Sequence, residues 1–309
     1  VYALHPFPAG NHLRFDEHYE EDLAKLQAKF KQVIDQGVRQ IAILADDFWN
    51  PGGQNGLRLL NDMTEWLKEV KKEYPDMKMT IPYVPYDYMG NGSSQELQIL
   101  KQAPDNVQIV MTGGRVWGEV TDNFTSTFTN NVSRGPFMWI NWPCTDNSKK
   151  HLIMGGYDTF LHPGVEPSKI QGIMLNPMQQ SEPSKVAIFG NASYAWNIWE
   201  TKEEAEEIWN ASFSFVDHNS AISNEASDAL REMSKHMINQ AMDSRVTALQ
   251  ESVVLKEQLN AFKEKLEAET LTAADVDAMI EEFELLQEAA KTYRASGNEA
   301  IKEQIVYWL

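Results

Sequence analysis

The chain has 309 residues, and 27 Lys and Arg against 45 Asp and Glu give it a net charge of −18. Apolar residues at 42% and charged residues at 23% exclude the composition of a disordered chain. The negative charge would repel a phosphate backbone, so neither a nucleic acid nor an anionic membrane surface is an expected partner. No apolar run approaches the roughly 18 residues of a membrane span. The single cysteine, Cys144, excludes an intramolecular disulfide and a cysteine-based zinc site.

The composition changes near residue 200. Residues 1–200 carry 17 basic and 23 acidic side chains, a net charge of −6, whereas residues 201–309 carry 10 and 22, a net charge of −12. Eight of the nine Trp lie between Trp49 and Trp209, and no Pro follows Pro183. We therefore predict two domains, residues 1–205 and 206–309, of which the second is helical.

Apolar runs that favour strands alternate with amphipathic stretches in the first predicted domain, which is typical of β/α units around a parallel sheet. The clearest helix is predicted over 18–36, where the apolar residues share one face and Gly37 can end the helix. A second helix is predicted over 57–73. The six predicted strands are Val1–His5, Gln40–Ala45, Met79–Val84, Val107–Thr112, Pro136–Asn141 and Ile170–Leu175.

Six such units fit either an open doubly wound sheet or most of an eight-stranded barrel. The polar residues lie directly after the predicted strands, not in a glycine-rich first turn, and the carboxyl ends of the strands form the catalytic face of a barrel. We therefore expect an α/β fold of the TIM-type (β/α)8 barrel, two strands short in this chain, followed by an all-α helical bundle domain.

The last third of the sequence has the periodicity of amphipathic helices. Thr272 can cap one helix, with Asp275 in its first turn. Another helix is predicted around 222–243, so a helical hairpin or a small bundle is expected. The two apolar stripes of the hairpin are Leu255, Leu259, Phe262 and Leu266, and then Val276, Met279, Ile280, Phe283 and Leu286.

Asp46 and Asp47 follow a wholly apolar strand and precede Phe48 and Trp49. Two neighbouring carboxylates that lose water repel each other, so at least one should have the raised pKa that a general acid requires. Paired carboxylates beside aromatic residues indicate glycoside hydrolysis, while helix capping or cation binding is the alternative interpretation. Successive side chains of a strand point to opposite faces, so the strand must break at Asp47 for both acids to reach one pocket.

Several Trp residues near the predicted strand ends could stack on the apolar face of a sugar, although each alone is more typical of a core. These Trp candidates are Trp49, Trp117, Trp139, Trp142, Trp196 and Trp199.

The sequence has no GxGxxG, Walker A, HExxH or GxSxG motif, so no cofactor and no metal is expected. His5, His12 and His18 lie close in sequence, but a loop and a helix start explain them more simply than a metal site.

Five motifs occur in order at the predicted strand ends: Ala45-Asp46-Asp47, Val84-Pro85-Tyr86-Asp87-Tyr88, Met111-Thr112-Gly113-Gly114, Trp139-Ile140-Asn141-Trp142-Pro143-Cys144-Thr145-Asp146 and Leu175-Asn176-Pro177-Met178. Together they resemble glycoside hydrolase family 84. That family holds bacterial β-N-acetylglucosaminidases, often labelled hyaluronidases, and eukaryotic O-GlcNAcases. The segment Tyr194-Ala195-Trp196-Asn197 resembles the one that closes the family's barrel. The resemblance covers about residues 1–200 and extends more loosely beyond.

The resemblance implies a retaining exo-β-N-acetylglucosaminidase that removes terminal GlcNAc from glycans or glycoproteins. The 2-acetamido oxygen of the sugar attacks the anomeric carbon to form an oxazoline, so no enzyme carboxylate is glycosylated. It also implies that Asp46 orients and polarises the acetamido N–H, and that Asp47 is the general acid and then the general base. The implied substrate-binding residues are Tyr88 at the acetamido oxygen, Thr112 and Trp139 in the acetamide pocket, Asn141 by the carboxylates, Asp146 at O4 and O6, and Asn176 at O3.

The start of the chain departs from the family pattern, because Val1–Pro6 already resembles the third strand of the barrel. The two earlier units, which supply a glycine and a lysine to the sugar site, would lie on a missing or separate N-terminal fragment. We therefore expect the chain to be inactive by itself. The alternatives are a catalytically incomplete sugar-binding or protein-interaction module and a hyaluronidase. The resemblance favours a secreted bacterial protein, with a cytoplasmic one as the alternative.

Overall fold

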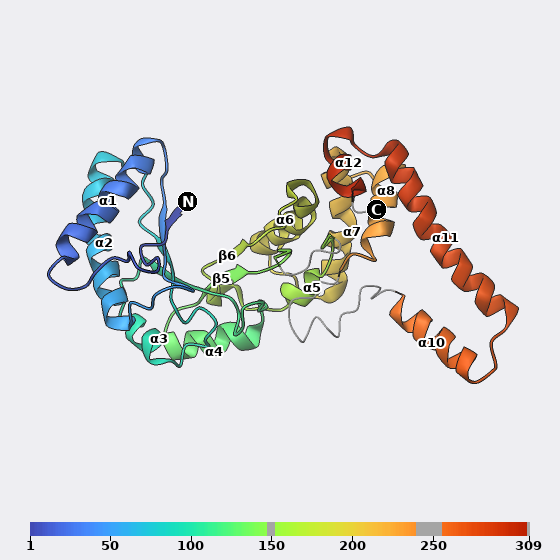
Figure 1. The fold of residues 1–309 in the computed structure, drawn as a ribbon, viewed down its shortest axis with the longest axis horizontal. Coiled ribbons are helices and arrows are strands. Elements are labelled where there is room, and N and C mark those ends of the chain that lie inside the picture. The colour runs from blue at the N-terminus through green and yellow to red at the C-terminus, as the bar shows by residue number, and fades with distance from the viewer. Residues whose placement is uncertain (147–151, 239–254, 308–309) are drawn as a thin grey trace. The chain divides into compact units, whose positions relative to one another are not determined.

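The computed structural model describes residues 1–146, 152–238 and 255–307 (Figure 1). Six strands form one sheet in the order β1-β2-β3-β4-β5-β6, and the pairs from β1 to β5 are parallel. The register places Ala3 opposite Ala42 and Tyr83 opposite Ile109. Each strand lies within its predicted range, which confirms all six predictions. The strands are β1 Tyr2–Leu4, β2 Ile41–Leu44, β3 Ile81–Val84, β4 Val107–Met111, β5 Phe137–Ile140 and β6 Gly172–Leu175.

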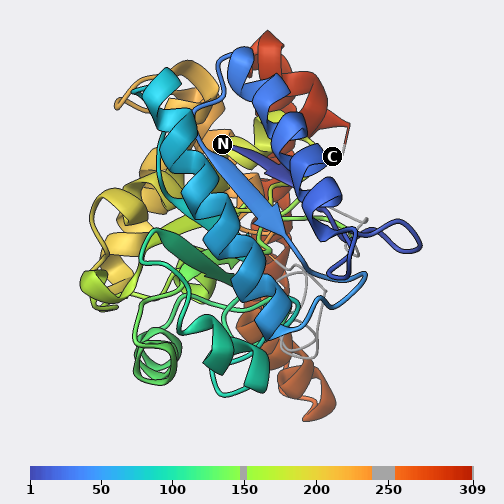
Figure 2. The same ribbon diagram turned by 90° about the vertical axis from the view of Figure 1, so that its left-hand side faces the viewer.

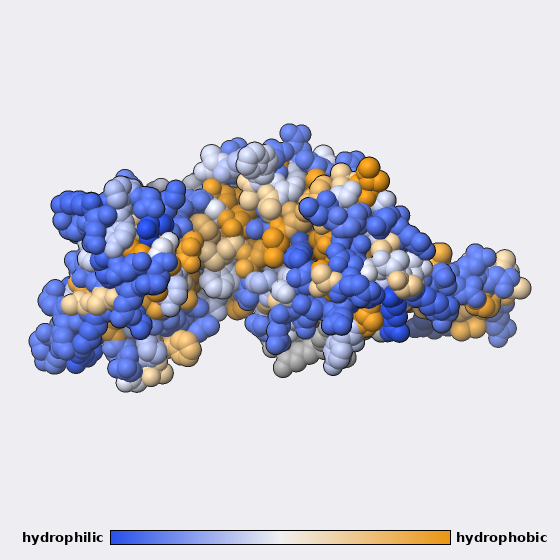
Figure 3. All heavy atoms as spheres, turned by 90° about the horizontal axis from the view of Figure 1, so that it is seen from above, coloured by the Kyte–Doolittle hydropathy of each residue, from blue (hydrophilic) through white to orange (hydrophobic). Residues whose placement is uncertain are grey.

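Helices α1 (Tyr19–Asp35) and α2 (Gly53–Glu73) confirm the first two predicted helices. They lie side by side in front of the strands (Figure 2), and the surface over them is mostly hydrophilic (Figure 3). Gly37 has a φ of +102°, a left-handed conformation that ends α1 at little cost. Helix α2 begins four residues before its predicted start, because the chain is already helical directly after Gly52, whose φ is +78°.

Shorter helices connect the remaining strands. Helix α3 (Gln95–Leu100) is capped by Ser94, and α4 (Asp122–Val132) by Thr121, whose hydroxyl accepts a hydrogen bond from the Phe124 amide. After β5 come α5 (Tyr157–Phe160) and the 3-10 turn η1 (Pro167–Lys169), and α6 (Ser181–Trp196) follows β6. None of the helices in the described ranges is both long and apolar enough to cross a membrane.

The chain divides into two compact units. The first comprises Val1–Trp139 and Glu166–Ile173, and the second comprises Ile140–Val165 and Met174–Leu309. This division falls within β5 and β6. The predicted boundary between residues 205 and 206 lies inside helix α7 (Lys202–His218), and a domain division at that place stays a prediction.

The described residues after α7 form the helices α8 (Glu225–Ser234), α10 (Lys256–Glu267), α11 (Ala273–Ser296) and α12 (Glu299–Val306). Helix α8 confirms part of the helix predicted over 222–243, of which residues 239–243 lie outside the described ranges. Thr272 caps α11 as predicted. Its hydroxyl accepts a hydrogen bond from the Asp275 amide, and the Asp275 carboxylate accepts one from the Thr272 amide.

Apart from Leu255, which is buried, the apolar stripes predicted for the hairpin are exposed or only half-buried. Val276, Ile280 and Phe283 of α11 are 37–49% exposed, and no residue of α10 is buried. The buried positions of α11, Ala289 and Tyr293, lie in its second half, and α11 packs on α8. Periodicity indicates which residues share a helix face, but only a covering element removes that face from water. A helical bundle domain therefore stays a prediction.

Candidate active site

The strand β2 changes direction at the paired acids. The Ala45 amide still donates to the carbonyl of Val84 across the sheet, at 2.8 Å. Three residues later the Phe48 amide donates to the carbonyl of Asp46 at 2.7 Å, and Asp47, between Asp46 and Phe48, has a φ of +62°. A hydrogen bond from residue i+2 back to residue i defines a γ-turn, and a left-handed residue other than glycine costs about 1–3 kcal/mol. The expected break of the strand at Asp47 is therefore present.

Asp46 is half-buried, and its pKa lies above the ordinary value of 3.8 because burial disfavours the charged form and because Asp47 adds a negative charge. Its Oδ1 atom is buried and has no hydrogen-bond partner among the described residues. The expectation that one acid of the pair has a raised pKa is met at Asp46. The resemblance assigns the general acid to the exposed Asp47 instead.

His5 holds the backbone of this turn. Its Nδ1 accepts a hydrogen bond from the Phe7 amide at 3.2 Å, so Nε2 carries the proton and donates to the carbonyl of Asp46 at 2.7 Å. The same Nε2 lies 3.9 Å from Asp46 Oδ1. Sequence reasoning placed His5 in a loop and missed this contact. The sequence signal that could have found this contact is the position of His5 at the end of a predicted strand. His5 lies just after β1 as Asp46 lies just after β2.

Tyr88, from the loop after β3, reaches the second acid. Its hydroxyl donates to Asp47 Oδ1 at 3.0 Å. Burial, followed by the bond to Asp47, raises the pKa of Tyr88 to about 12, so the phenol keeps its proton. The Thr112 amide donates to the carbonyl of Tyr88 at 3.0 Å, while the Thr112 hydroxyl lies 2.5 Å from the carbonyl of Arg115. Thr112 therefore fixes the loop that carries Tyr88.

Glu96, at the start of α3, was not among the residues predicted for the site. Its two carboxylate oxygens accept hydrogen bonds from the backbone amides of Tyr86 and Asp87, at 3.1 and 3.0 Å. Burial raises its pKa, and the two amide bonds oppose that shift. Glu96 thus holds the turn from which Tyr88 projects. No sequence pattern marks it, because its partners are backbone groups.

Replacing Glu96 by Ala should destabilise this loop by about 1–3 kcal/mol, because two backbone amides lose their acceptor. Hydrogen exchange of the Tyr86 and Asp87 amides measures the effect and should become faster. The control is Glu69→Ala, since Glu69 is exposed and pairs with Lys72 on the surface. If exchange at Tyr86 and Asp87 were the same in both variants, Glu96 would not support the loop.

The remaining predicted residues lie in both units. Trp139, half-buried at the end of β5, belongs to the first unit. In the second unit the Asn176 amide nitrogen donates to Asn141 Oδ1 at 3.1 Å, and the backbone amide of Asn176 donates to the carbonyl of Ile140. Asp146 is exposed, directly before residues outside the described ranges. The structure thus brings Asp46, Asp47, Tyr88 and Thr112 together in one unit, and Asn141 and Asn176 in the other.

The six Trp candidates have different environments. Trp142 and Trp199 are fully buried and pack on Phe160 and Tyr157, so they belong to the core of the second unit. Trp49 stacks on His12 with ring centroids 3.9 Å apart. Among the rest, Trp117 and Trp139 are half-buried and Trp196 is 93% exposed.

The three histidines that cluster in sequence have different partners. His5 binds the Asp46 carbonyl, His12 stacks on Trp49, and His18 interacts with Asp16. They do not share a common partner, which agrees with the interpretation that they belong to a loop and a helix start.

Residues 1–235 match the model of a family described as beta-N-acetylglucosaminidase. The chain belongs to this family. The solved structure of CpGH84D is similar over 99% of the chain and 50% of its own length, with 29% identity and a TM-score of 0.83. The chain therefore spans about half the length of that relative. This family agrees with the resemblance to glycoside hydrolase family 84, which is based on the motifs at the strand ends.

Two more distant structures share the fold. CpGH84B is 22% identical over 98% of the chain and 52% of its own length, with a TM-score of 0.79. A variant of an O-GlcNAc hydrolase from Thermobaculum terrenum is 19% identical over 98% of the chain and 63% of its own length, with a TM-score of 0.69.

Proposed function

We propose that this member of the β-N-acetylglucosaminidase family is a retaining exo-glycosidase that releases terminal β-linked GlcNAc from a glycan or an O-GlcNAc glycoprotein. The observation that carries the proposal is the buried Oδ1 of Asp46, an acceptor without a donor among the described residues, beside a second acid that holds a tyrosine hydroxyl. The acetamido N–H of GlcNAc is a donor of the kind that this oxygen lacks.

In this proposal the acetamido oxygen of the sugar attacks the anomeric carbon while Asp47 protonates the leaving oxygen, and an oxazoline forms. Asp46 accepts the acetamido N–H and offsets the positive charge that develops on the ring. Burial raises the pKa of Asp46 in the sugar-free protein, but a donated N–H favours the carboxylate and counteracts this. Asp47 then removes a proton from the water that opens the oxazoline.

The other roles follow the family pattern. Tyr88 donates to the acetamido oxygen, leaving Asp47 when the sugar binds, and Thr112 and Trp139 form the acetamide pocket. In that pattern Asn141 acts beside the carboxylates, Asp146 binds O4 and O6, and Asn176 binds O3. The observed bonds of Thr112 to backbone carbonyls support a role in positioning Tyr88 rather than a direct contact of its hydroxyl with the sugar.

Hydrolysis of an aryl β-N-acetylglucosaminide tests the proposal. The first product should have the β configuration when the reaction is followed by NMR, and a thiazoline analogue of the oxazoline should compete strongly with the substrate. An α product would refute retention. Hydrolysis that the thiazoline does not inhibit would refute assistance by the acetamido group.

The complete fold is part of the same proposal. We propose that the six strands belong to an eight-stranded barrel, followed by a helical domain after residue 205. β1 and β6 lie at the two edges of the observed sheet, where further strands of a barrel would pair.

Replacing Tyr88 by Phe should lower kcat/KM roughly two- to tenfold, because a hydrogen bond to the neutral acetamido oxygen is worth about 0.5–1.5 kcal/mol. Initial rates on the aryl glycoside measure the loss. The matched control is Tyr74→Phe, whose hydroxyl bonds Lys31 and Asp35 on the surface and should not matter for turnover. An unchanged kcat/KM in Tyr88→Phe would show that the Tyr88 hydroxyl has no role in the reaction.

A further inference from the structure

A second group of ligating side chains lies in the second unit, apart from the paired acids. His236 follows the end of α8, Glu232 lies in its last turn, and Glu282 comes from α11, which packs on α8. Each offers one ligand atom, and the three atoms lie within 4.8 Å of one another. Glu232 and His236 are four residues apart, and the helical turn that continues beyond α8 places both on one face.

His236 is half-buried, and its ring nitrogens lack the partners that shielded polar atoms normally have, as far as the described residues go. Both of its ring nitrogens are shielded from solvent, and neither has a hydrogen bond within the described part of the chain. Buried polar atoms are paired in the large majority of cases, so an unpaired one needs an explanation. Burial lowers the pKa of His236, which leaves the neutral imidazole that metal ions bind.

The backbone holds His236 in place. The Lys235 amide donates to the carbonyl of Arg231 and the His236 amide to that of Met233, which continues the helical turn beyond α8. The carbonyl of Met237 accepts a hydrogen bond from the Met154 amide at 2.6 Å. The backbone is therefore held on both sides of His236, which helps to preform the position of a ligand.

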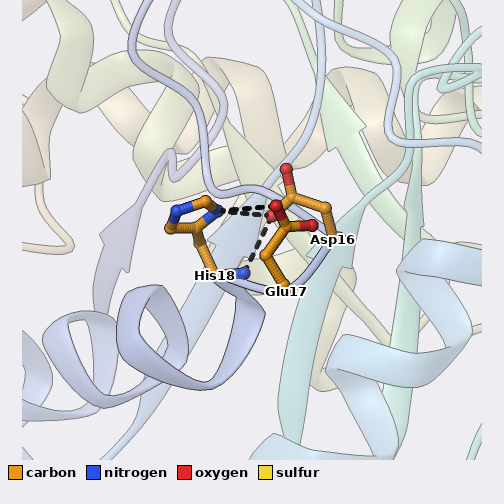
Figure 4. Close-up of side chains that lie close together, drawn as sticks. All are labelled: Asp16, Glu17 and His18. Carbon is orange, nitrogen blue, oxygen red and sulfur yellow. Dashed lines mark hydrogen bonds and ion pairs between the residues drawn. The ribbon is translucent and has the colours of Figure 1, made fainter.

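A second group of two carboxylates and one histidine lies in the loop before α1, and its geometry follows from bonds within that loop. Asp16, Glu17 and His18 are consecutive, exposed or nearly so, and already bonded to one another (Figure 4). The His18 amide and Nδ1 both contact Asp16 Oδ1, at 2.9 and 3.1 Å. These bonds within the loop account for its geometry, so this cluster serves as a control.

We propose that Glu232, His236 and Glu282 bind one divalent transition-metal ion such as Zn²⁺ and thereby link α8 to α11. Zinc takes imidazole nitrogen and carboxylate oxygen at about 2.0–2.2 Å, which places neighbouring ligands of a tetrahedral site about 3.4 Å apart. For a metal ion to bind, rotation of the two glutamate side chains would have to reduce the observed separations of up to 4.8 Å to this spacing. The imidazole favours zinc over Mg²⁺ or Ca²⁺, which prefer oxygen ligands.

One cation already lies at the cluster. Lys235 Nζ is 2.5 Å from Glu232 Oε2. A carboxylate has two oxygens, so Glu232 can keep this bond and offer its other oxygen to the metal. The net charge of −12 on residues 201–309 further favours a dication in this part of the chain.

Titration calorimetry with Zn²⁺, on the tag-free 309-residue chain, tests the proposal. We expect one equivalent to bind and the melting temperature to rise, with both effects reversed by a chelator. His236→Ala and Glu282→Gln should each weaken binding at least tenfold, whereas His18→Ala should leave it unchanged. Mg²⁺ should not produce the rise.

Two further measurements keep the test independent of folding defects. Co²⁺ bound in place of Zn²⁺ should give the intense visible bands of a tetrahedral site, and these should disappear in Glu282→Gln, which removes a charge but little volume. Zinc binding of equal strength in wild type and Glu282→Gln would overturn the proposal. So would the absence of binding to the wild-type chain, or binding that is lost in His18→Ala.

Discussion

Replacing Asp47 by Ala is expected to lower kcat on an alkyl-linked GlcNAc substrate by about 10²–10⁴-fold, because the proton donor to the leaving oxygen is lost. The loss should be much smaller on a nitrophenyl glycoside, whose leaving oxygen needs little protonation. Steady-state rates on both substrates, in a preparation that hydrolyses both, measure the difference. A loss that depends on the leaving group is the signature of a missing general acid.

The backbone at Asp47 supplies sharp controls. Asn and Gly accept the left-handed φ of +62° better than Ala does, so Asp47→Asn and Asp47→Gly should melt at a higher temperature than Asp47→Ala. Both should nevertheless be inactive on the alkyl-linked substrate. Asp76→Ala, which removes an exposed carboxylate paired with Arg39, should keep full activity.

The outcome for Asp47→Asn also separates enzyme from binding module. A kcat within twofold of wild type would exclude Asp47 as the general acid. A wild-type protein that binds GlcNAc but never hydrolyses it, with an affinity unchanged in Asp47→Asn, would instead favour the sugar-binding module.

Replacing Asp46 by Asn should lower kcat/KM by about 10²–10³-fold, because the charge that opposes the developing oxazolinium is removed. The pH profile should change as well. The proposed mechanism needs Asp46 ionised, and burial and Asp47 raise its pKa above 3.8. Wild-type kcat/KM should therefore fall as the pH decreases through that raised pKa, and Asp46→Asn should lose this acid limb.

The profile of kcat/KM against pH for wild type, Asp46→Asn and Tyr88→Phe decides the assignment. Tyr88→Phe should keep the acid limb. The phenol of Tyr88 has a pKa of about 12 in the wild type, so its removal does not affect titration in the acidic range. An acid limb that persists unchanged in Asp46→Asn would belong to another group, and the proposed role of Asp46 would be wrong.

Much of the fold could be predicted because its signals are local. The run from Ile41 to Ala45 is apolar throughout, as a strand buried on both faces must be, and four of these five residues are indeed buried. The cap at Thr272 was predictable for the same reason, since the bonds of a capping box join residues three apart. The early start of α2 could not be predicted, because Gly52 and Gly53 have no side chains that could show a helical pattern of apolar residues.

The supporting residues of the candidate site could not be predicted in this way. Glu96 acts on backbone amides ten and nine residues earlier, and His5 acts on a carbonyl 41 residues away. Neither interaction leaves a pattern of residue types or spacings. The exposed stripe of α11 shows the same limit, because burial depends on which element covers a face.

The sequence by itself determined the order of the β/α units, the acids at the end of β2 and the family to which the five motifs point, because these depend on residue types and their spacing. Only the tertiary structure decided that Asp47 turns out of the strand in a left-handed conformation, that Tyr88 reaches it, and that Asp46 is the acid with the raised pKa. The physical reason is that hydrogen bonding and desolvation act through space, between groups that the chain brings together only when it folds.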